Sequence, residues 1–422
     1  MIEKYYDGAI EQVAAGLGTV EKNYLLVRYS GQFSVENLND TKQLEKNEDI
    51  FVQVHEFETG EITCAYEPYL TMICDGFRRY MTGTFEEFME TCDVYYLHRP
   101  VLLGYFNQDN TGREEIILLD EVAYEQERML AALERMLCAI ADRHPVLFVL
   151  NRFQLASKST MQLTARFLKC ENCNIGLVLG VSDIQAMPEF LVPDWEMLYE
   201  TLDDGSKIYH IGNSGRKKEE TIDDEKYVDY GSEKVYRKLQ NMVEFLDFDQ
   251  AAYYLETIER KIKFDNLLVD DAARFRMWLL FVKVSILRQD IPKALEICED
   301  LEKIHLAGKE EECAYEQDYL IATAYMYQGK LKEALEMAGE TYRIAGKMSD
   351  DYRMFLSELL EAKIQMSGWY NIFFCAQDVK IKESLIQNLI RYNYRNHLAH
   401  VYIYAYDNKP EIVKKQTSPR SF

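Results

Sequence analysis

The sequence predicts an α/β domain with a parallel β-sheet, followed by an all-α solenoid of helix pairs. Three observations support this two-part prediction. Short apolar segments alternate with helical patterns in residues 1–211, strand signals nearly disappear after residue 230, and a helix-pair pattern repeats between residues 232 and 406. With 422 residues, the chain is long enough for two or three domains that each bury an apolar core.

The first part contains five short segments with the composition of strands, at residues 24–29, 50–55, 146–150, 174–181 and 207–211. Helical periodicity occurs between them, at residues 5–15, 35–45, 69–80, 84–97, 121–142 and 159–169. Thr84 and Glu87 have the spacing of a capping box at the start of one of these helices. Because strands alternate with helices and the central strands are almost wholly apolar, we expect a parallel sheet with helices on its faces.

The second part contains an internal repeat built around a small residue. Ala251, Ala294 and Ala334 occupy equivalent positions and lie 43 and 40 residues apart. A tight turn at 288–290 or 328–330 precedes the last two alanines, and a weaker fourth copy begins at residue 367. A small residue lets the two helices of a pair approach closely. The spacing therefore predicts a solenoid of about four helix pairs, each burying its face on the next.

A polar segment separates the two parts. Residues 212–230 are rich in charged residues and glycine and predict a linker. We therefore expect an α/β domain at 1–211, the solenoid at 231–406, and a flexible tail at 407–422, where Pro410 and Pro419 occur among few apolar residues.

The net charge of −23 restricts the class of partner. Residues 1–214 contain 17 basic and 35 acidic residues, so this part alone carries −18. Such a negative field disfavours nucleic acid and anionic membranes as partners. The chain begins without the apolar core of a secretory signal, and its longest apolar stretch, 277–287, is too short to span a bilayer. We therefore expect a cytoplasmic protein with no membrane partner.

The end of the 146–150 strand is the most informative position in the first part. Asn151 and Arg152 stand where the strand that positions magnesium in an ATPase ends in Asp or Glu. A magnesium site needs anionic oxygen to offset partial dehydration of the ion, and Arg152 places a cation there instead. Two interpretations remain: a structural pair that replaced a lost site, which we favour, or a rebuilt site in which Arg152 binds an anionic ligand as a fork.

Gln154 and Ala156 follow this strand, and residues 64–69 lead from the second strand into an amphipathic helix. On these features, residues 1–211 resemble the ATPase module of signal-transduction ATPases of the maltose-activator type, which have the P-loop NTPase fold. That family pairs the module with tetratricopeptide repeats, and Gly329-Lys330-Leu331-Lys332-Glu333-Ala334-Leu335-Glu336 is similar to a tetratricopeptide core. The resemblance implies a nucleotide-driven switch followed by protein-binding repeats.

The motifs that would carry the ATPase chemistry are eroded at three places. After the first strand the family pattern is G-x-x-x-x-G-K-[ST], whose backbone and lysine bind the phosphates. Here residues 30–37 retain one glycine, Gly31, and contain no lysine. The acids after the third strand are replaced, and Ser182-Asp183 stand where the family has a sensing arginine. The comparison implies a pseudo-ATPase, and we assign no catalytic, cofactor-binding or metal-binding residues and no cofactor.

The remaining candidate residues favour structural roles. Cys170 and Cys173 form a CxxC pair, but no second pair follows at a spacing that zinc requires. His397 and His400 share a helix face at i,i+3, without a third ligand nearby in the sequence. Tyrosines are dense near the C-terminus and favour a core role over a groove lining; they are Tyr392, Tyr394, Tyr402, Tyr404 and Tyr406.

These observations predict a non-enzymatic regulatory or scaffold protein that binds a protein partner through its tetratricopeptide-like repeats. One alternative is a signalling NTPase switch that still binds nucleotide. Another is the sensor part of a transcriptional or cyclase regulator without its output domain. The sequence identifies neither the partner nor the oligomeric state.

Overall fold

The computed structural model describes residues 2–17, 24–29, 49–58, 60–109, 121–170, 174–182, 187–202, 208–211, 229–265, 267–367 and 382–408. Several predicted features lie outside these ranges: the 35–45 helix, the segment 30–37 that contains Gly31, Cys173, Asp183, most of the 212–230 linker, most of the start of the fourth repeat and nearly all of the tail. No helix within the described ranges is long and apolar enough to span a bilayer.

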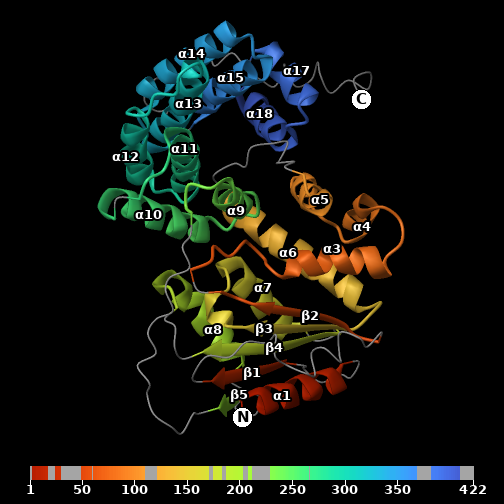
Figure 1. The fold of residues 1–422 in the computed structure, drawn as a ribbon. Helices are drawn as coiled ribbons and strands as arrows, with labels where there is room; N and C mark the ends of the chain where they lie inside the picture. The colour runs from red at the N-terminus through yellow and green to blue at the C-terminus, as the bar shows by residue number, and fades with distance from the viewer. Residues whose placement is uncertain are drawn as a thin grey trace, which may run out of the picture. The chain divides into compact units, whose positions relative to one another are not determined.

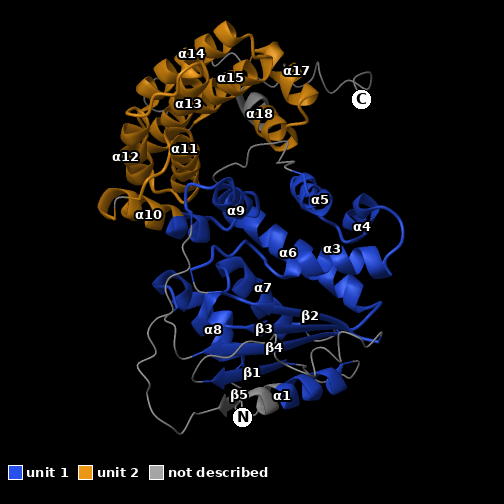
Figure 2. Cartoon of the chain, viewed as in Figure 1, with its two compact units in different colours: residues 1–112, 120–254 blue, residues 113–119, 255–422 orange. Residues whose placement is uncertain are grey.

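Two compact units divide the chain (Figure 2). The first comprises residues 1–112 and 120–254, and the second comprises residues 113–119 and 255–422. Strands occur only in the first unit among the residues that are described. The prediction of an α/β region followed by a helical region is therefore confirmed at this level.

The elements of the first unit, in chain order, are α1 (Ile2–Gly16), β1 (Tyr24–Tyr29), β2 (Phe51–Glu56), α3 (Tyr69–Tyr80), α4 (Phe85–Thr91), α5 (Arg99–Asn107), α6 (Val122–Ala141), β3 (Val146–Asn151), the 3-10 helix η3 (Phe153–Leu155), α7 (Lys158–Lys169), β4 (Ile175–Ser182), the 3-10 helix η4 (Glu189–Leu191), α8 (Val192–Leu202), β5 (Ile208–Ile211), α9 (Glu233–Glu244) and the first turns of α10 (Phe248–Phe264). All five predicted strands are present, each within one residue of its expected limits.

The five strands form one sheet in the order β2-β3-β4-β1-β5, and every neighbouring pair is parallel (Figure 1). Every residue of β3 and β4 is buried, as expected for central strands covered on both faces. Helix α1 covers one face, where Ile10 and Val13 pack against Val27, Val149 and Val178. On the other face, the ring of Tyr69 from α3 packs edge-on against Phe148. The parallel sheet predicted from the sequence is thereby confirmed.

The helix predicted at 84–97 is shorter in the structure. The capping box of Thr84 and Glu87 starts α4 as expected, but α4 ends at Thr91. Asp93 adopts a left-handed conformation with a φ of 52°, which turns the chain out of the helix. Pro100 then lies in the first turn of α5, a helix that the sequence analysis missed. Proline is tolerated in a first turn but not inside a helix, so this segment forms two helices.

The second unit continues from α10 with α11 (Asp271–Leu287), α12 (Ile291–Leu301), α13 (Glu310–Gln328), α14 (Leu331–Met348), α15 (Asp351–Met366), α17 (Glu383–Arg391) and α18 (Arg395–Asn408). The turns predicted at 288–290 and 328–330 separate α11 from α12 and α13 from α14. Gly329 ends α13 with a φ of 80°, a conformation that glycine adopts without strain. Ala294 and Ala334 are fully buried, so they permit the close helix contact that the repeat predicts.

The helix pairs stack into a curved layer. Within this unit, α11, α13 and α15 form the inner row and α12 and α14 the outer row (Figure 1). Neighbouring pairs share apolar clusters, such as the one that joins Ala322 of α13, Ala338 of α14 and Leu360 of α15. Tyr394 is also part of such a cluster, and its hydroxyl lies 2.7 Å from that of Tyr352. Tyr392 and Tyr402 pack against the same cluster, as the core interpretation of these tyrosines requires.

Candidate functional site

The carboxyl ends of the strands are the place to look for a site, because parallel α/β sheets bind ligands beyond that edge. Since all strands run in one direction, Tyr29, Glu56, Asn151 and Ser182 end β1, β2, β3 and β4 at the same edge. Asn151 was singled out from the sequence. The structure brings the other three strand ends to it.

A direct hydrogen bond joins the ends of β1 and β3. The Tyr29 hydroxyl donates to the side-chain oxygen of Asn151 over 2.6 Å, and both side chains are buried. Strand β4 lies between β1 and β3, so this bond crosses a strand. Gly180 of β4 is the register partner of Val27 and shares the sheet face of Val178.

A second contact joins β2 and β3. Arg152 Nε lies 3.4 Å from Glu56 Oε1, and the two side chains are 24 % and 17 % exposed. Glu56 and Asn151 are register partners, and the amide of Phe57 donates to the carbonyl of Asn151. Arg152 itself has a φ of 53°, a left-handed conformation that is uncommon for a residue with a side chain. The interpretation of Arg152 as one half of an ion pair agrees with this geometry.

A third set of bonds joins the segment after β3 to β4. Gln154 donates to the carbonyl of Ser182 and accepts from its amide, at 3.1 and 3.3 Å. Phe153, the residue before it, is fully buried. Gln154, one of the two residues on which the sequence resemblance after the third strand rests, therefore fixes the end of β4.

Burial governs the electrostatics of this edge. It raises the pKa of the Tyr29 hydroxyl to about 12, although the positive charge of Arg152 acts in the opposite direction. The Glu56 carboxylate raises the same pKa further. Tyr29 therefore stays neutral and remains a hydrogen-bond donor at any physiological pH.

The segment after β3 also binds the α9–α10 hairpin within the first unit. Ser157 caps α7, and the next two amides of α7 donate to side chains of the hairpin: Lys158 to Gln250 Oε1 and Ser159 to Asp247 Oδ2. Asp247 Oδ1 also accepts from the amide of Gln250, so one carboxylate binds the N-termini of two helices. The side chain of Lys158 pairs with Asp249.

Asp247 is buried, and burial raises the pKa of its carboxyl group even though the Ser159 and Gln250 hydrogen bonds favour the charged form. Apolar contacts accompany the polar ones, since the Phe245 ring packs edge-on against Tyr66 and Tyr105. The first helices after the predicted linker are thereby fixed to the sheet unit.

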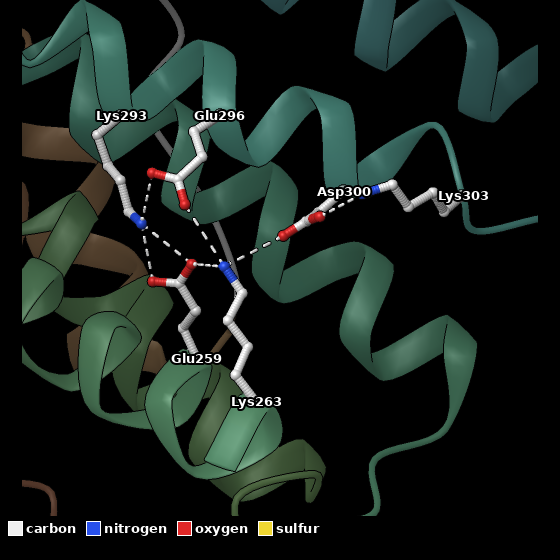
Figure 3. A network of polar contacts seen from close by, with 6 residues as sticks. All are labelled: Glu259, Lys263, Lys293, Glu296, Asp300 and Lys303. Atoms are coloured by element: carbon white, nitrogen blue, oxygen red, sulfur yellow. Dashed lines mark hydrogen bonds and ion pairs between the residues drawn. The ribbon is translucent and has the colours of Figure 1, made fainter.

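The second unit contains a network of charged residues between α10 and α12 (Figure 3). The Glu259 carboxylate accepts from Lys263 at 2.7 Å and from Lys293 at 2.9 Å. Glu296 of α12 binds the same two lysines, whereas Asp300 of α12 binds Lys263 and Lys303. Each charge shown is matched by an opposite one, which indicates a structural contact between the helices.

The other sequence candidates are not brought together into a site. His397 is buried beside the ring of Tyr394, whereas His400 is exposed. Cys170 is partly buried at the end of α7, and its CxxC partner lies outside the described residues. Within the described part of the chain, no three His, Cys, Asp or Glu side chains are grouped in a way that would hold a metal ion.

The sequence analysis missed Tyr29, Glu56 and Asp247. Tyr29 ends a predicted strand and Glu56 directly follows one, so an inspection of every strand end would have identified them. The bond of Asp247 with Gln250 is local, but its bond with Ser159, 88 residues earlier, leaves no pattern in the sequence around Asp247. Comparisons with protein-family models, with curated proteins and with solved structures gave no match.

Proposed function

We propose that this protein is a non-enzymatic regulatory or scaffold protein. In this proposal the helical repeats bind a protein partner, and the sheet unit is a pseudo-ATPase module of the signal-transduction type. The single observation that carries the proposal is the direct bond between Tyr29 and Asn151. In an ATPase of this type, phosphates and magnesium lie between the ends of the first and third strands.

Charge at the edge supports the same conclusion. A magnesium ion needs carboxylate or other hard oxygen ligands. Among the four described strand ends, Glu56 contributes the only carboxylate, and it is paired with Arg152. An edge with one acid bound to one cation favours a structural role over metal-assisted phosphoryl transfer.

The arrangement of the helices supports the binding role of the second unit. Stacked helix pairs present an extended inner surface, and repeat proteins of this construction use that surface for partners. The ion pairs between α10 and α12 and the apolar clusters between α13, α14 and α15 fix the pairs to one another. A rigid surface loses little conformational entropy on binding.

The pseudo-ATPase part is tested with purified full-length protein. We expect ATP and GTP hydrolysis equal to buffer alone. We also expect a melting temperature that millimolar nucleotide leaves unchanged, with and without magnesium. Hydrolysis that is lost in an Arg152→Ala variant would overturn the proposal and favour the NTPase switch. A melting temperature that rises with nucleotide, without hydrolysis, would favour a nucleotide-binding switch.

The partner-binding part needs a pair of matched variants. Arg276 and Lys283 are exposed on α11 of the inner row, and Lys332 and Lys347 are exposed on α14 of the outer row. Both R276E/K283E and K332E/K347E change the net charge by −4. We expect proteins captured from extracts of the source cells to be retained by K332E/K347E and lost with R276E/K283E. Equal loss in both variants, or in neither, contradicts binding through the inner row.

A further inference from the structure

Arg152 combines a strained backbone with a position at the ligand-binding edge of a parallel sheet. Its φ of 53° lies in a region that residues with side chains rarely adopt. Such conformations persist where surrounding contacts hold them, and they concentrate at ligand sites. The conformation directly follows β3, whose last residue, Asn151, is fully buried.

The guanidinium of Arg152 is bound to an oxyanion of the chain itself. Its Nε lies 3.4 Å from the Glu56 carboxylate, and the Tyr29 side chain is near enough for Arg152 to lower the pKa of its hydroxyl. A guanidinium is planar, always charged, and matches the geometry of carboxylates and phosphates. Glu56 therefore binds Arg152 as an external oxyanion would.

We propose that the carboxyl edge of the sheet contains a binding site for a small phosphate-type anion on Arg152, which Glu56 occupies and keeps closed. This inference deepens the proposed function and rests on it in one respect. Both assume that the carboxyl edge of the sheet is closed to ligands in the wild-type protein. The Tyr29–Asn151 bond limits the ligand to a small, metal-free anion such as pyrophosphate. Edges of this kind in α/β sheets bind phosphate groups, which favours phosphate over other oxyanions.

Competition explains why Glu56 keeps the site closed. A carboxylate on the neighbouring strand acts at an effective concentration on the order of mM or higher, because it is part of the same chain. Free anions at lower concentration do not displace it. The charge of −18 on residues 1–214 opposes free anions further. Replacing Glu56 by glutamine removes the competing charge and retains the shape of the side chain.

The test compares the full-length wild type with E56Q and E56Q/R152Q. Melting temperatures are measured in increasing sodium pyrophosphate, against sodium chloride of equal ionic strength. For E56Q we expect a rise of about 3 °C when pyrophosphate is tenfold above its Kd. The wild type and E56Q/R152Q should rise by less than about 1 °C, because the first retains Glu56 and the second lacks the cation.

A matched control tests whether any arginine that loses its acidic partner would bind pyrophosphate. Arg166 is 29 % exposed and pairs with Glu134 at 2.7 Å and with Glu127 at 2.6 Å, so E127Q/E134Q releases an arginine of similar burial away from the edge. A rise in E127Q/E134Q as large as in E56Q overturns the proposal, as does a rise that persists in E56Q/R152Q. No rise in E56Q also overturns it.

Two further outcomes keep the test decisive. Should E56Q fail to fold by circular dichroism, E56D retains the charge but shortens the side chain by one methylene. It should give a smaller rise than 3 °C but a larger one than wild type, and no rise would reject the site. A wild-type response equal to that of E56Q rejects closure by Glu56. ATP hydrolysis by the wild type, in contrast, rejects the proposed function and the closed edge; the response of E56Q relative to E56Q/R152Q still decides whether Arg152 binds an anion.

Discussion

The Tyr29 hydroxyl donates a 2.6 Å hydrogen bond to the side chain of Asn151, although the strand β4 lies between the strands that carry them. The bond closes the space between the ends of β1 and β3. It also fixes the two strand ends to one another. Loss of this bond should therefore lower the free energy of unfolding, independently of any ligand.

Tyr29→Phe should lower the free energy of unfolding by about 1–2 kcal/mol. The change removes one hydrogen bond and leaves the buried Asn151 oxygen with one donor fewer. Urea unfolding of the sheet unit, followed by fluorescence, measures the loss. Tyr124→Phe makes the same chemical change on a side chain that is 69 % exposed and should alter stability by less than about 0.5 kcal/mol. Equal effects of the two variants would contradict the importance of the bond.

The same pair makes a prediction about alkaline pH. The folded pKa of Tyr29, about 12, lies above 10, the ordinary pKa of a tyrosine in water. A raised folded pKa contributes stability that is complete below pH 10 and is lost as the pH rises through 12. The stability advantage of wild type over Tyr29→Phe should therefore shrink above pH 10 and disappear by about pH 12, because the shift of the pKa corresponds to about 2.7 kcal/mol in total and exceeds the loss of about 1–2 kcal/mol expected from removing the hydrogen bond. Unfolding curves of both proteins between pH 8 and about 12 test this; a constant difference would contradict it.

Much of the fold could be predicted from the sequence, because strands and helix pairs leave local patterns. The central strands are short apolar runs, and the alanines of the repeat mark close helix contacts. The end of α4 could not be predicted, because the left-handed turn at Asp93 leaves little trace in the helical periodicity. The missed α5 lies next to a polar loop whose composition concealed it.

The candidate site was predictable only in part. Asn151 and Arg152 stand out in the sequence because two polar residues directly follow an apolar strand. The partners of these residues depend on strand order, which local patterns do not determine. The bond between Tyr29 and Asn151 spans β4, so it can be recognised only once the strand order is known. The buried position of Asp247 could not be predicted for a similar reason, since its burial depends on a contact with α7.

Asp247→Ala should lower the free energy of unfolding by about 2–3 kcal/mol. One carboxylate accepts from the amides of Ser159 in α7 and Gln250 in α10, so its loss leaves one buried amide at the N-terminus of each helix without its acceptor. Asp249→Ala is the matched control two residues away. It removes a partly exposed ion pair with Lys158 and should cost less than about 1 kcal/mol. Chemical denaturation of both variants gives the comparison, and a smaller loss in Asp247→Ala would be inconsistent with the double cap.

The network of charged residues between α10 and α12 predicts that two glutamate variants lose unequal amounts of stability. Glu259 is 9 % exposed and accepts from Lys263 and Lys293, so Glu259→Ala leaves two neighbouring lysines without their shared acceptor. We expect a loss of about 2 kcal/mol, which should decrease in high salt. Glu296→Ala removes a carboxylate that binds the same lysines but is 53 % exposed, and it should cost less than about 1 kcal/mol. Thermal unfolding of both variants at low and high salt tests the expectation, and equal losses would contradict it.

Replacing Asp318 of α13 by asparagine should stabilise the protein. Partial burial raises the pKa of its carboxyl group to about 6, and the nearby carboxylates of Glu340 and Glu302 add to the shift. A raised folded pKa contributes stability that is complete below about pH 3.8 and is lost as the pH rises through 6. At pH 8 the charged form is therefore unfavourable, and Asp318→Asn should stabilise the protein by about 1 kcal/mol after allowance for solvent screening.

The stabilisation by Asp318→Asn should decrease as the pH falls. Below about pH 4, Asp318 is protonated in the folded wild type, so the asparagine variant should lose its advantage. Melting temperatures of the two proteins at pH 8, 6 and about 4 provide the test. Glu333→Gln on α14 removes one negative charge from an exposed position and controls for the change in net charge. An equal gain in Glu333→Gln would show that the effect arises from net charge. The chain carries a net charge of −23, so removing any negative charge reduces the repulsion within the protein.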